Sequence, residues 1–321
     1  MKLVIQIPCF NEADHLPTTL EDLPEQLHGI DRIEVVVVDD GSTDDTAAVA
    51  KSRGVTEVVR HTGNQGLGRA FRSGLDRSLA LGADIIVNTD ADGQYRGEDL
   101  ARLIAPILAG EADIVIGDRR PHRDPGSPRH KRWLQRIGSR AVRSLAGIDV
   151  PDAVSGFRAL SRQAALRMNI LSRFSYTVEM ILQAASKDLR IAWVPVTTRP
   201  DTRPSRLFRS LPQFIGLQLV AMLRMYAMYS PVRVFFGLGA ILGFAGALPV
   251  LRFLMLYLAG QGDGHVQSLL LGGVLLTLGF IAFVTGLLAD LISQQRQLQE
   301  LTLEKVRALE ARAQAPEDRR D

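Results

Sequence analysis

The sequence predicts an α/β domain with a mostly parallel sheet, followed by a membrane-surface helix and a hairpin of two transmembrane helices. Short β-branched runs alternate with helical patterns over the first half of the chain, as in folds whose sheet is covered by helices. Acidic clusters follow several of these runs directly. Two long uncharged runs near the C-terminus explain why a chain with 23% charged residues has a mean hydropathy of +0.06.

Four apolar runs predict strands of the sheet, at residues 3–8, 33–39, 84–89 and 112–117, and a further strand is expected near 55–61. The runs do not alternate polar and apolar residues, so we expect both faces of the strands to be buried. Helical patterns lie between them, at residues 14–27, 43–53, 67–81 and 97–109. Sheets of this kind bind ligands beyond the carboxyl ends of their strands.

Polar clusters lie at those strand ends, in the segments 8–12 (PCFNE), 39–44 (DDGSTD) and 90–94 (DADGQ). Helix capping accounts for Ser42, Thr43 and Asp44, which precede a helical pattern. It does not account for two adjacent acids at 39 and 40, or for the pair at 90 and 92. The clusters therefore predict a ligand site at one edge of the sheet.

Asp90 and Asp92 place two carboxylates at one strand end, where like charges without a partner repel. A divalent cation removes this repulsion, and Mg²⁺ or Mn²⁺ prefers oxygen ligands. The amide oxygen of Gln94 lies two residues further on and is a third candidate ligand. We therefore expect a Mg²⁺ or Mn²⁺ site made by these three residues.

A glycine-containing turn, NQGLGRA at residues 64–70, opens the helix predicted at 67–81. Its glycines permit a close approach of a phosphate group to a helix N-terminus. The turn is not the dinucleotide fingerprint, because that motif follows the first strand and Phe71 stands where the third glycine would be. A hydride-transfer enzyme is therefore disfavoured.

Two uncharged runs are long enough to cross a lipid bilayer, Val234–Leu251 and Leu269–Ala289. Arg252 interrupts the first, which continues to Ala259, so we expect spans over residues 231–259 and 269–292. The connecting loop, Gly260–Ser268, has no Lys or Arg, whereas both outer flanks do. By the positive-inside rule, the N-terminal domain and both termini face the cytoplasm.

Residues 205–230 repeat apolar side chains at helical spacing between basic ends, which predicts an amphipathic helix in the membrane interface. The alternative is a core helix of the preceding domain, which we place at residues 1–204. Residues 293–321 are expected to form a polar helical tail with imperfect heptads, compatible with a homo-oligomer.

The composition excludes other classes of protein. A net charge of +3 gives no argument for nucleic-acid binding. The chain has one cysteine, Cys9, so it has no disulfide within the chain.

Taken together, the segments IPCFNE, VVDDGSTD, NQGLGRA, TDADGQY and DAVSGFRA resemble the inverting GT-A glycosyltransferases of family 2. Within that family the chain most resembles the polyprenyl-phosphate glycosyltransferases of the dolichol-phosphate mannose synthase type. The resemblance covers about residues 1–230, and the hairpin that follows is similar to that of one subgroup.

The resemblance implies a metal-dependent, inverting transfer of a sugar from a GDP- or UDP-sugar to a polyprenyl phosphate at the cytoplasmic membrane face. It implies that the donor is bound by Pro8, Phe10, Glu12, Val38, Asp40, Asp90, Ala91 and Arg119. It implies that the acceptor phosphate is bound by Arg132, Ser155, Arg158, Arg203 and Arg206, with Asp92 and Arg158 as the catalytic pair. Many relatives have Ser-Lys where this chain has Ser205-Arg206, which keeps the charge.

The acceptor is itself an acid, which limits the chemistry that the protein must supply. A phosphate monoester is largely dianionic at neutral pH and needs no strong general base. In-line attack would invert the anomeric carbon, so no covalent enzyme intermediate is expected. Two candidate bases remain, Asp92 and Glu179, and the alternative for Glu179 is an acid on a helix surface.

Three other functions stay open. The first is transfer to another membrane acceptor, such as a polysaccharide or glycolipid, although a Q-x-x-R-W motif is missing and two spans are few for a polymer channel. The second is a membrane scaffold without activity, which is expected to have lost the metal acids. The third is a nucleotidyltransferase, which would have a glycine-rich loop where this chain reads PCFNE.

Overall fold

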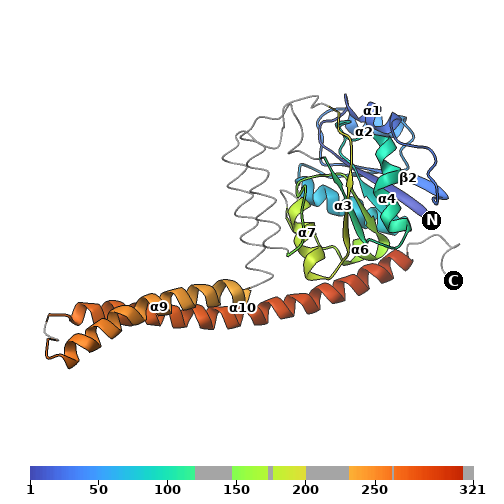
Figure 1. Cartoon of the computed structure of the whole chain (residues 1–321). Coiled ribbons are helices and arrows are strands. Elements are labelled where there is room, and N and C mark those ends of the chain that lie inside the picture. Colours follow the sequence, from blue (N-terminus) through green and yellow to red (C-terminus); the bar gives the residue numbers. More distant parts are fainter. Residues whose placement is uncertain (120–146, 173–175, 200–230, 262–263, 314–321) are drawn as a thin grey trace. The chain divides into compact units, whose positions relative to one another are not determined.

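The computed structural model describes residues 1–119, 147–172, 176–199, 231–261 and 264–313 (Figure 1). The chain divides into two compact units. The first comprises Met1–Phe214 with Leu301–Asp321, and the second comprises Ile215–Glu300. The interfacial helix predicted at 205–230 lies outside the described residues.

The first unit is built on a seven-stranded sheet among the described residues, with the order β3-β2-β1-β4-β6-β5-β7. β6 is antiparallel to both of its neighbours, and the other pairs are parallel. The strands are β1 (Lys2–Cys9), β2 (Arg32–Asp39), β3 (Glu57–Arg60), β4 (Ile85–Asn88), β5 (Ile114–Asp118), β6 (Arg158–Ser161) and β7 (Ile191–Pro195). The predicted mostly parallel sheet is confirmed.

Two strands of the sheet, β6 and β7, were not predicted. β6 has only four residues and begins with an arginine, so no apolar run marks it. It nevertheless pairs with β4 and β5, where Asn88 and Ile116 both lie opposite Arg158. The sheet therefore contains a strand whose position depends on its neighbours more than on its own β propensity.

The four predicted helices at 14–27, 43–53, 67–81 and 97–109 are present and differ from the prediction only at their ends, whereas α6 was not predicted. In the first unit they are α1 (Leu16–Glu21), α2 (Thr46–Ser52), α3 (Leu67–Ala80), η1 (Gly97–Asp99), α4 (Leu100–Leu108), α6 (Arg162–Arg167) and α7 (Thr177–Ser186). α1 is shorter than the predicted 14–27, because Pro24 disfavours a helical conformation at the residue before it.

Helices cover both faces of the sheet. The odd positions of β1, such as Ile5 and Ile7, share one buried core with Leu16 of α1 and Leu103 of α4. On the other face, a Cβ at Gly74 of α3 would lie 2.8 Å from the Gln6 side chain, and Phe71 of α3 stacks on Tyr176 with ring centroids 3.9 Å apart. This two-sided burial explains why β1 is apolar on both faces apart from Lys2 and Gln6.

The second unit contains α9 (Pro231–Leu258) and most of α10 (Val266–Ala313), which run side by side (Figure 1). Both helices are long and apolar enough to cross a membrane. Glycines bring them into contact: a Cβ at Gly279 would lie 3.0 Å from the carbonyl oxygen of Gly239. Small residues at such crossings let helix backbones approach closely in lipid.

The predicted polar tail continues α10 without a break to Ala313. Its last turns belong to the first unit, where Arg307 donates to the carbonyl oxygen of Met168 at 2.6 Å and lies 3.3 Å from Asp76. The domain boundaries at 204, 230 and 293 remain predictions.

Candidate functional site

The carboxyl ends of β1, β2 and β4 meet at one edge of the sheet. Cys9 pairs with Asp39 at the ends of β1 and β2, and Gln6 of β1 pairs with Asn88 at the end of β4. Because β6 is antiparallel, its first residue, Arg158, lies opposite Asn88 at the same edge. The loops that follow β1, β2 and β4, and the described residues directly before β6, therefore gather there.

The first two loops are bonded to each other through Asn11. Its backbone N–H donates to Ser42 Oγ at 2.9 Å, and its side-chain oxygen accepts from Thr43 N at 2.8 Å. Asn11 has a φ of 56°, a left-handed conformation that is uncommon for a residue with a side chain. Such conformations persist where surrounding contacts hold them, often at functional sites.

The predicted capping role of Ser42 and Thr43 is wrong, because both side chains bond to Asn11. α2 begins at Thr46, and of these three residues it is Asp44 that bonds to its start, accepting from Thr46 N at 3.1 Å.

Asp40 holds the glycine-containing turn. Its carboxylate accepts from Gln65 N at 2.9 Å and from Gly66 N at 2.8 Å, and it bonds to His61 Nδ1 at 2.7 Å. Its neighbour Asp39 accepts from Ser42 N at 2.8 Å and lies 3.2 Å from Arg60 Nε. Both carboxylates are buried, so the acidic pair that capping left unexplained organises two loops of the site.

The third loop carries the predicted metal ligands. Asp92 Oδ1 accepts from Gln94 N at 3.1 Å, which folds the loop back on itself. Loss of solvent around Asp90, together with the charge of Asp92, raises the pKa of Asp90 to about 7. Two carboxylates close enough for the charge of one to raise the pKa of the other fit a divalent cation, and the same loop carries the side-chain amide of Gln94. Among the residues that the structure describes, no group of three His, Cys, Asp or Glu side chains offers an alternative site.

Gly156 leaves room for the Asp90 side chain. A Cβ at position 156 would lie 2.7 Å from both carboxylate oxygens of Asp90. Gly156 is itself fixed, because its N–H donates to Tyr95 Oη at 3.0 Å and its carbonyl accepts from Asn88 Nδ2 at 2.9 Å. Residues 155–158 (SGFR) therefore contact the loop that carries the predicted metal ligands.

Arg119, expected near the donor, forms a bidentate pair with Asp152. Its Nε and Nη2 lie 2.7 and 3.0 Å from the two carboxylate oxygens. The side chain of Asp152 is almost completely buried. The pair joins the end of β5 to the loop before β6.

Arg158 is completely buried. Its guanidinium donates to three backbone carbonyls, those of Ser155 at 2.8 Å, Thr177 at 2.7 Å and Ala153 at 2.9 Å. It also lies 5.7 Å from the centroid of the Tyr176 ring, and burial lowers its pKa to about 10. In this structure the Arg158 side chain holds the loop at 153–155 through its hydrogen bonds to backbone carbonyls. Its contact with an acceptor phosphate stays a prediction.

Glu179 is buried in α7, so it is not an acid on a helix surface. Its carboxylate oxygens accept from Leu171 N at 3.0 Å and from Ser172 N at 2.9 Å. These bonds fix the segment before α7.

The remaining predicted residues are of three kinds. Phe10 is exposed at 39%, which suits a ring that lies against a ligand. The others at the strand ends are buried: Pro8, Glu12, Val38, Ala91 and Ser155. Arg132, Arg203 and Arg206 lie outside the described residues.

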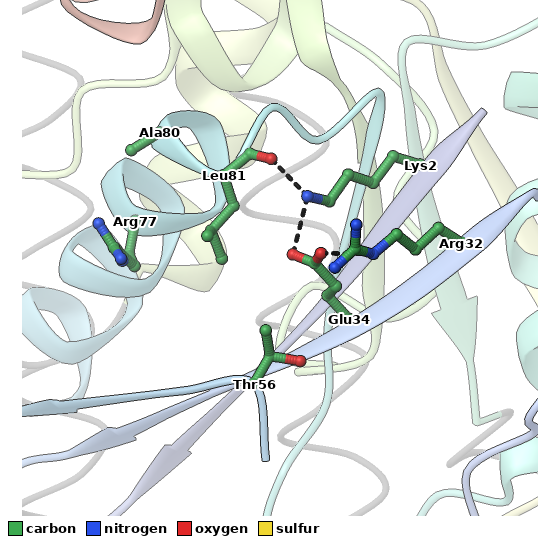
Figure 2. A pocket seen from close by; sticks show the side chains of 7 residues that line it. All are labelled: Lys2, Arg32, Glu34, Thr56, Arg77, Ala80 and Leu81. Carbon is green, nitrogen blue, oxygen red and sulfur yellow. Dashed lines mark hydrogen bonds and ion pairs between the residues drawn. The ribbon is translucent and has the colours of Figure 1, made fainter. Parts of the chain in front are cut away.

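A hollow of about 580 Å³ lies at the opposite edge of the sheet, where β1 and β2 begin (Figure 2). Lys2 and Arg32 both pair with Glu34 there, at 2.8 Å each. The third cation in its lining, Arg77, pairs with Glu57 at 2.8 Å. Its charges are thus already paired, and the loops of the candidate site lie at the other edge.

Sequence comparisons identify relatives with named activities. The chain is 31% identical over 210 residues to an undecaprenyl-phosphate mannosyltransferase of Micrococcus luteus, covering 61% of this chain and 83% of the relative. It is 28% identical over 209 residues to a polyprenol monophosphomannose synthase of Mycolicibacterium smegmatis, covering 61% and 77%.

The fold is similar to that of glucosyl-3-phosphoglycerate synthase from Mycobacterium tuberculosis, solved with UDP, at a TM-score of 0.55 and 23% identity. The similarity covers 71% of this chain and 79% of the other, and that enzyme has also been solved with Mn²⁺ and UDP. The sheet is thus of the GT-A type. Residues 4–167 match the family described as Glycosyl transferase family 2, which is more than half of the chain. The chain therefore belongs to glycosyl transferase family 2.

Proposed function

We propose that this glycosyltransferase moves a sugar from a nucleoside-diphosphate sugar to a polyprenyl phosphate, with inversion at the anomeric carbon and with the help of Mg²⁺ or Mn²⁺. The observation that carries the proposal is the paired carboxylates of Asp90 and Asp92 at the carboxyl edge of the sheet. One relative described above is named for undecaprenyl phosphate and the other for polyprenol monophosphomannose, which supports this acceptor class.

Asp90, Asp92 and Gln94 would hold the divalent cation. A bound cation would supply positive charge to the leaving diphosphate of the donor. The chain's own part is to fix these three residues. Asp92 bonds to the backbone of Gln94, and Gly156 keeps space beside Asp90. The raised pKa of Asp90 supports this role, since it indicates a carboxylate whose charge the protein alone does not neutralise.

The donor nucleoside is proposed to bind across the ends of β1 and β2, as the glycosyltransferase resemblance implies. Phe10 offers an exposed ring there, and Glu12 is buried beside it. Asp40 is proposed to act through the turn at 65–66, which it holds by two backbone bonds. The fully buried Val38 would form the floor.

The acceptor phosphate is proposed to attack without help from a strong base, since it is already largely dianionic at neutral pH. Ser155 and Arg158 belong to the loop before β6 that adjoins Asp90 through Gly156. Arg119 is proposed to lend positive charge near the donor, although Asp152 offsets much of it. Arg132, Arg203 and Arg206 remain proposed phosphate ligands.

The proposed topology places the first unit and both termini in the cytoplasm, with α9 and α10 crossing the membrane. Their length and apolar character support two spans. A lipid-linked acceptor requires a site near the bilayer surface, which two membrane helices would provide. Transfer to another membrane acceptor is the competing function.

The deciding experiment incubates membranes that contain the protein with labelled GDP- and UDP-sugars, polyprenyl phosphate and Mg²⁺ or Mn²⁺. Mannose donors come first, because both relatives are named for mannose transfer. We expect lipid-extractable label from one donor. Asp92→Ala should abolish this transfer while the protein remains folded and in the membrane. Full activity in that variant would show that the proposed metal site at Asp92 is not needed for transfer. No transfer from any donor would refute the proposal.

A further inference from the structure

The loop that carries Asp90, Asp92 and Gln94 is held from outside by two segments far from it in sequence. One is the end of α1, at Asp22. The other is the segment after β7, Val196–Arg199. Neither was singled out by the sequence, and neither has a role in the proposed function.

Asp22 bonds to the end of the loop and to the second segment at once. Its Oδ2 accepts from Gly97 N at 2.7 Å, and its Oδ1 accepts from Arg199 Nη2 at 2.7 Å. The backbones are in direct contact, because a Cβ at Gly97 would lie 1.7 Å from the carbonyl oxygen of Asp22. Position 97 therefore requires glycine in this arrangement.

Arg199 contacts the middle of the loop. Its backbone N–H donates to the carbonyl oxygen of Gln94 at 2.8 Å, and its Nη1 donates to that of Gly93 at 3.2 Å. One residue earlier, Thr198 forms an antiparallel bridge with Tyr95. The segment thus runs antiparallel to the loop at this point.

The backbone of Gln94 bonds both to Asp92 and to Arg199. Its N–H donates to Asp92 Oδ1, and its carbonyl accepts from Arg199. A displacement of Arg199 would therefore move the backbone of one candidate metal ligand and loosen the turn that orients another. Partners that orient metal ligands without touching the metal usually affect metal affinity.

We propose that Asp22 and Arg199 are positioning residues that fix the geometry of the metal-binding loop. The inference rests on the proposed function for the identity of the metal ligands. Arg199 joins Asp22 to two carbonyls of the loop, so the pair acts as one clamp. Substitution of either residue should weaken the binding of Mn²⁺ more than it changes the rate at saturating Mn²⁺.

The test titrates Mn²⁺ into the full chain in detergent, with UDP and with GDP in turn, and follows free Mn²⁺ by electron paramagnetic resonance. Arg199→Ala should raise the dissociation constant about tenfold. Asp22→Ala should have a similar effect, and the double variant should be little worse than either one, because both remove the same clamp. In transfer assays the half-saturating Mn²⁺ concentration should rise while kcat at saturation stays within about threefold.

Arg190→Ala is the matched control. Arg190 forms a bidentate pair with Asp113, at 3.1 and 3.0 Å, next to the opposite end of β7. The Arg190→Ala variant should leave Mn²⁺ binding unchanged. The inference is overturned if Arg199→Ala leaves Mn²⁺ binding unchanged, if both arginine variants weaken it equally, or if the wild-type chain binds no Mn²⁺. Since the titration needs no sugar transfer, failure of every donor would refute the proposed function and leave this result standing.

Discussion

Gly156 lies directly against the carboxylate of Asp90. A Cβ at position 156 would lie 2.7 Å from Oδ1 and 2.7 Å from Oδ2, closer than side-chain contacts allow. Hydrogen bonds from Asn88 and to Tyr95 fix the backbone of Gly156 on both sides. The glycine cannot move away, so any larger residue must displace the carboxylate.

Gly156→Ala should therefore lower sugar transfer by about 10- to 100-fold, through weaker metal binding and not through unfolding. The measurement is transfer activity against Mn²⁺ concentration, with thermal denaturation as the check on folding. Gly63→Ala is the control, because a Cβ at Gly63 meets nothing within 4 Å. If Gly156→Ala kept full activity at low Mn²⁺, the packing of Asp90 would not matter for metal binding.

Metal binding should depend on pH through Asp90. Its pKa is about 7 in the metal-free protein, mainly because of lost solvation, against about 4 in an unfolded chain. Between these values the folded state binds more protons than the unfolded state, so the free energy of unfolding of the metal-free protein falls as the pH rises. A cation binds the ionised carboxylate, so its affinity should rise about tenfold per pH unit below 7 and level off above it.

The measurement for this pH dependence is a Mn²⁺ titration at about one pH unit below and one above neutrality. Added Mn²⁺ should also raise the thermal midpoint more at the higher pH. Equal affinities at the two pH values would show that Asp90 is already ionised below neutral pH.

We expect Arg158 to be needed for the stability of the fold as well as for the site. Removing its guanidinium leaves three backbone carbonyls without their donor, those of Ser155, Thr177 and Ala153. Arg158→Met should therefore cost about 3 kcal/mol or more of unfolding free energy. Denaturant unfolding in detergent measures this.

Arg158→Lys separates the two roles of this side chain. A lysine keeps the charge but cannot reach three carbonyls in the geometry of the guanidinium fork, so it should lose stability as well. A Lys variant of normal stability with a raised KM for the lipid would instead assign Arg158 to the acceptor phosphate.

Much of the fold was predictable because it depends on local patterns. The β-branched runs gave β1, β2 and β4, and the acids behind them identified the loops of the candidate site. The sequence indicates these features because a buried parallel strand needs a continuous apolar run, and because polar ligands collect at its carboxyl end.

The contacts that shape the site were not predictable in the same way. Asp22 and Arg199 are 177 residues apart, and no periodicity connects them. The family resemblance implied that Arg158 binds the acceptor phosphate, and nothing in the sequence indicates that this side chain is completely buried. Only the pairing of β6 with β4 and β5 places its side chain among backbone carbonyls.

The helical hairpin offers a prediction with an internal control. A Cβ at Gly279 of α10 would lie 3.0 Å from the carbonyl oxygen of Gly239 and from Gly243 N, both on α9. Gly273, on the same helix, meets nothing within 4 Å. Gly279→Leu should therefore separate the helices, whereas Gly273→Leu should leave their packing unchanged.

Disulfide cross-linking can measure this separation. The rings of Phe236 and Phe283 are 5.0 Å apart, so the substitutions Phe236→Cys and Phe283→Cys, made with Cys9→Ser, should form a disulfide on oxidation. Gly279→Leu should slow its formation several-fold, because the leucine would push the α9 backbone away close to Phe283. Equal rates in the two leucine variants would show that the glycine contacts do not hold the hairpin together.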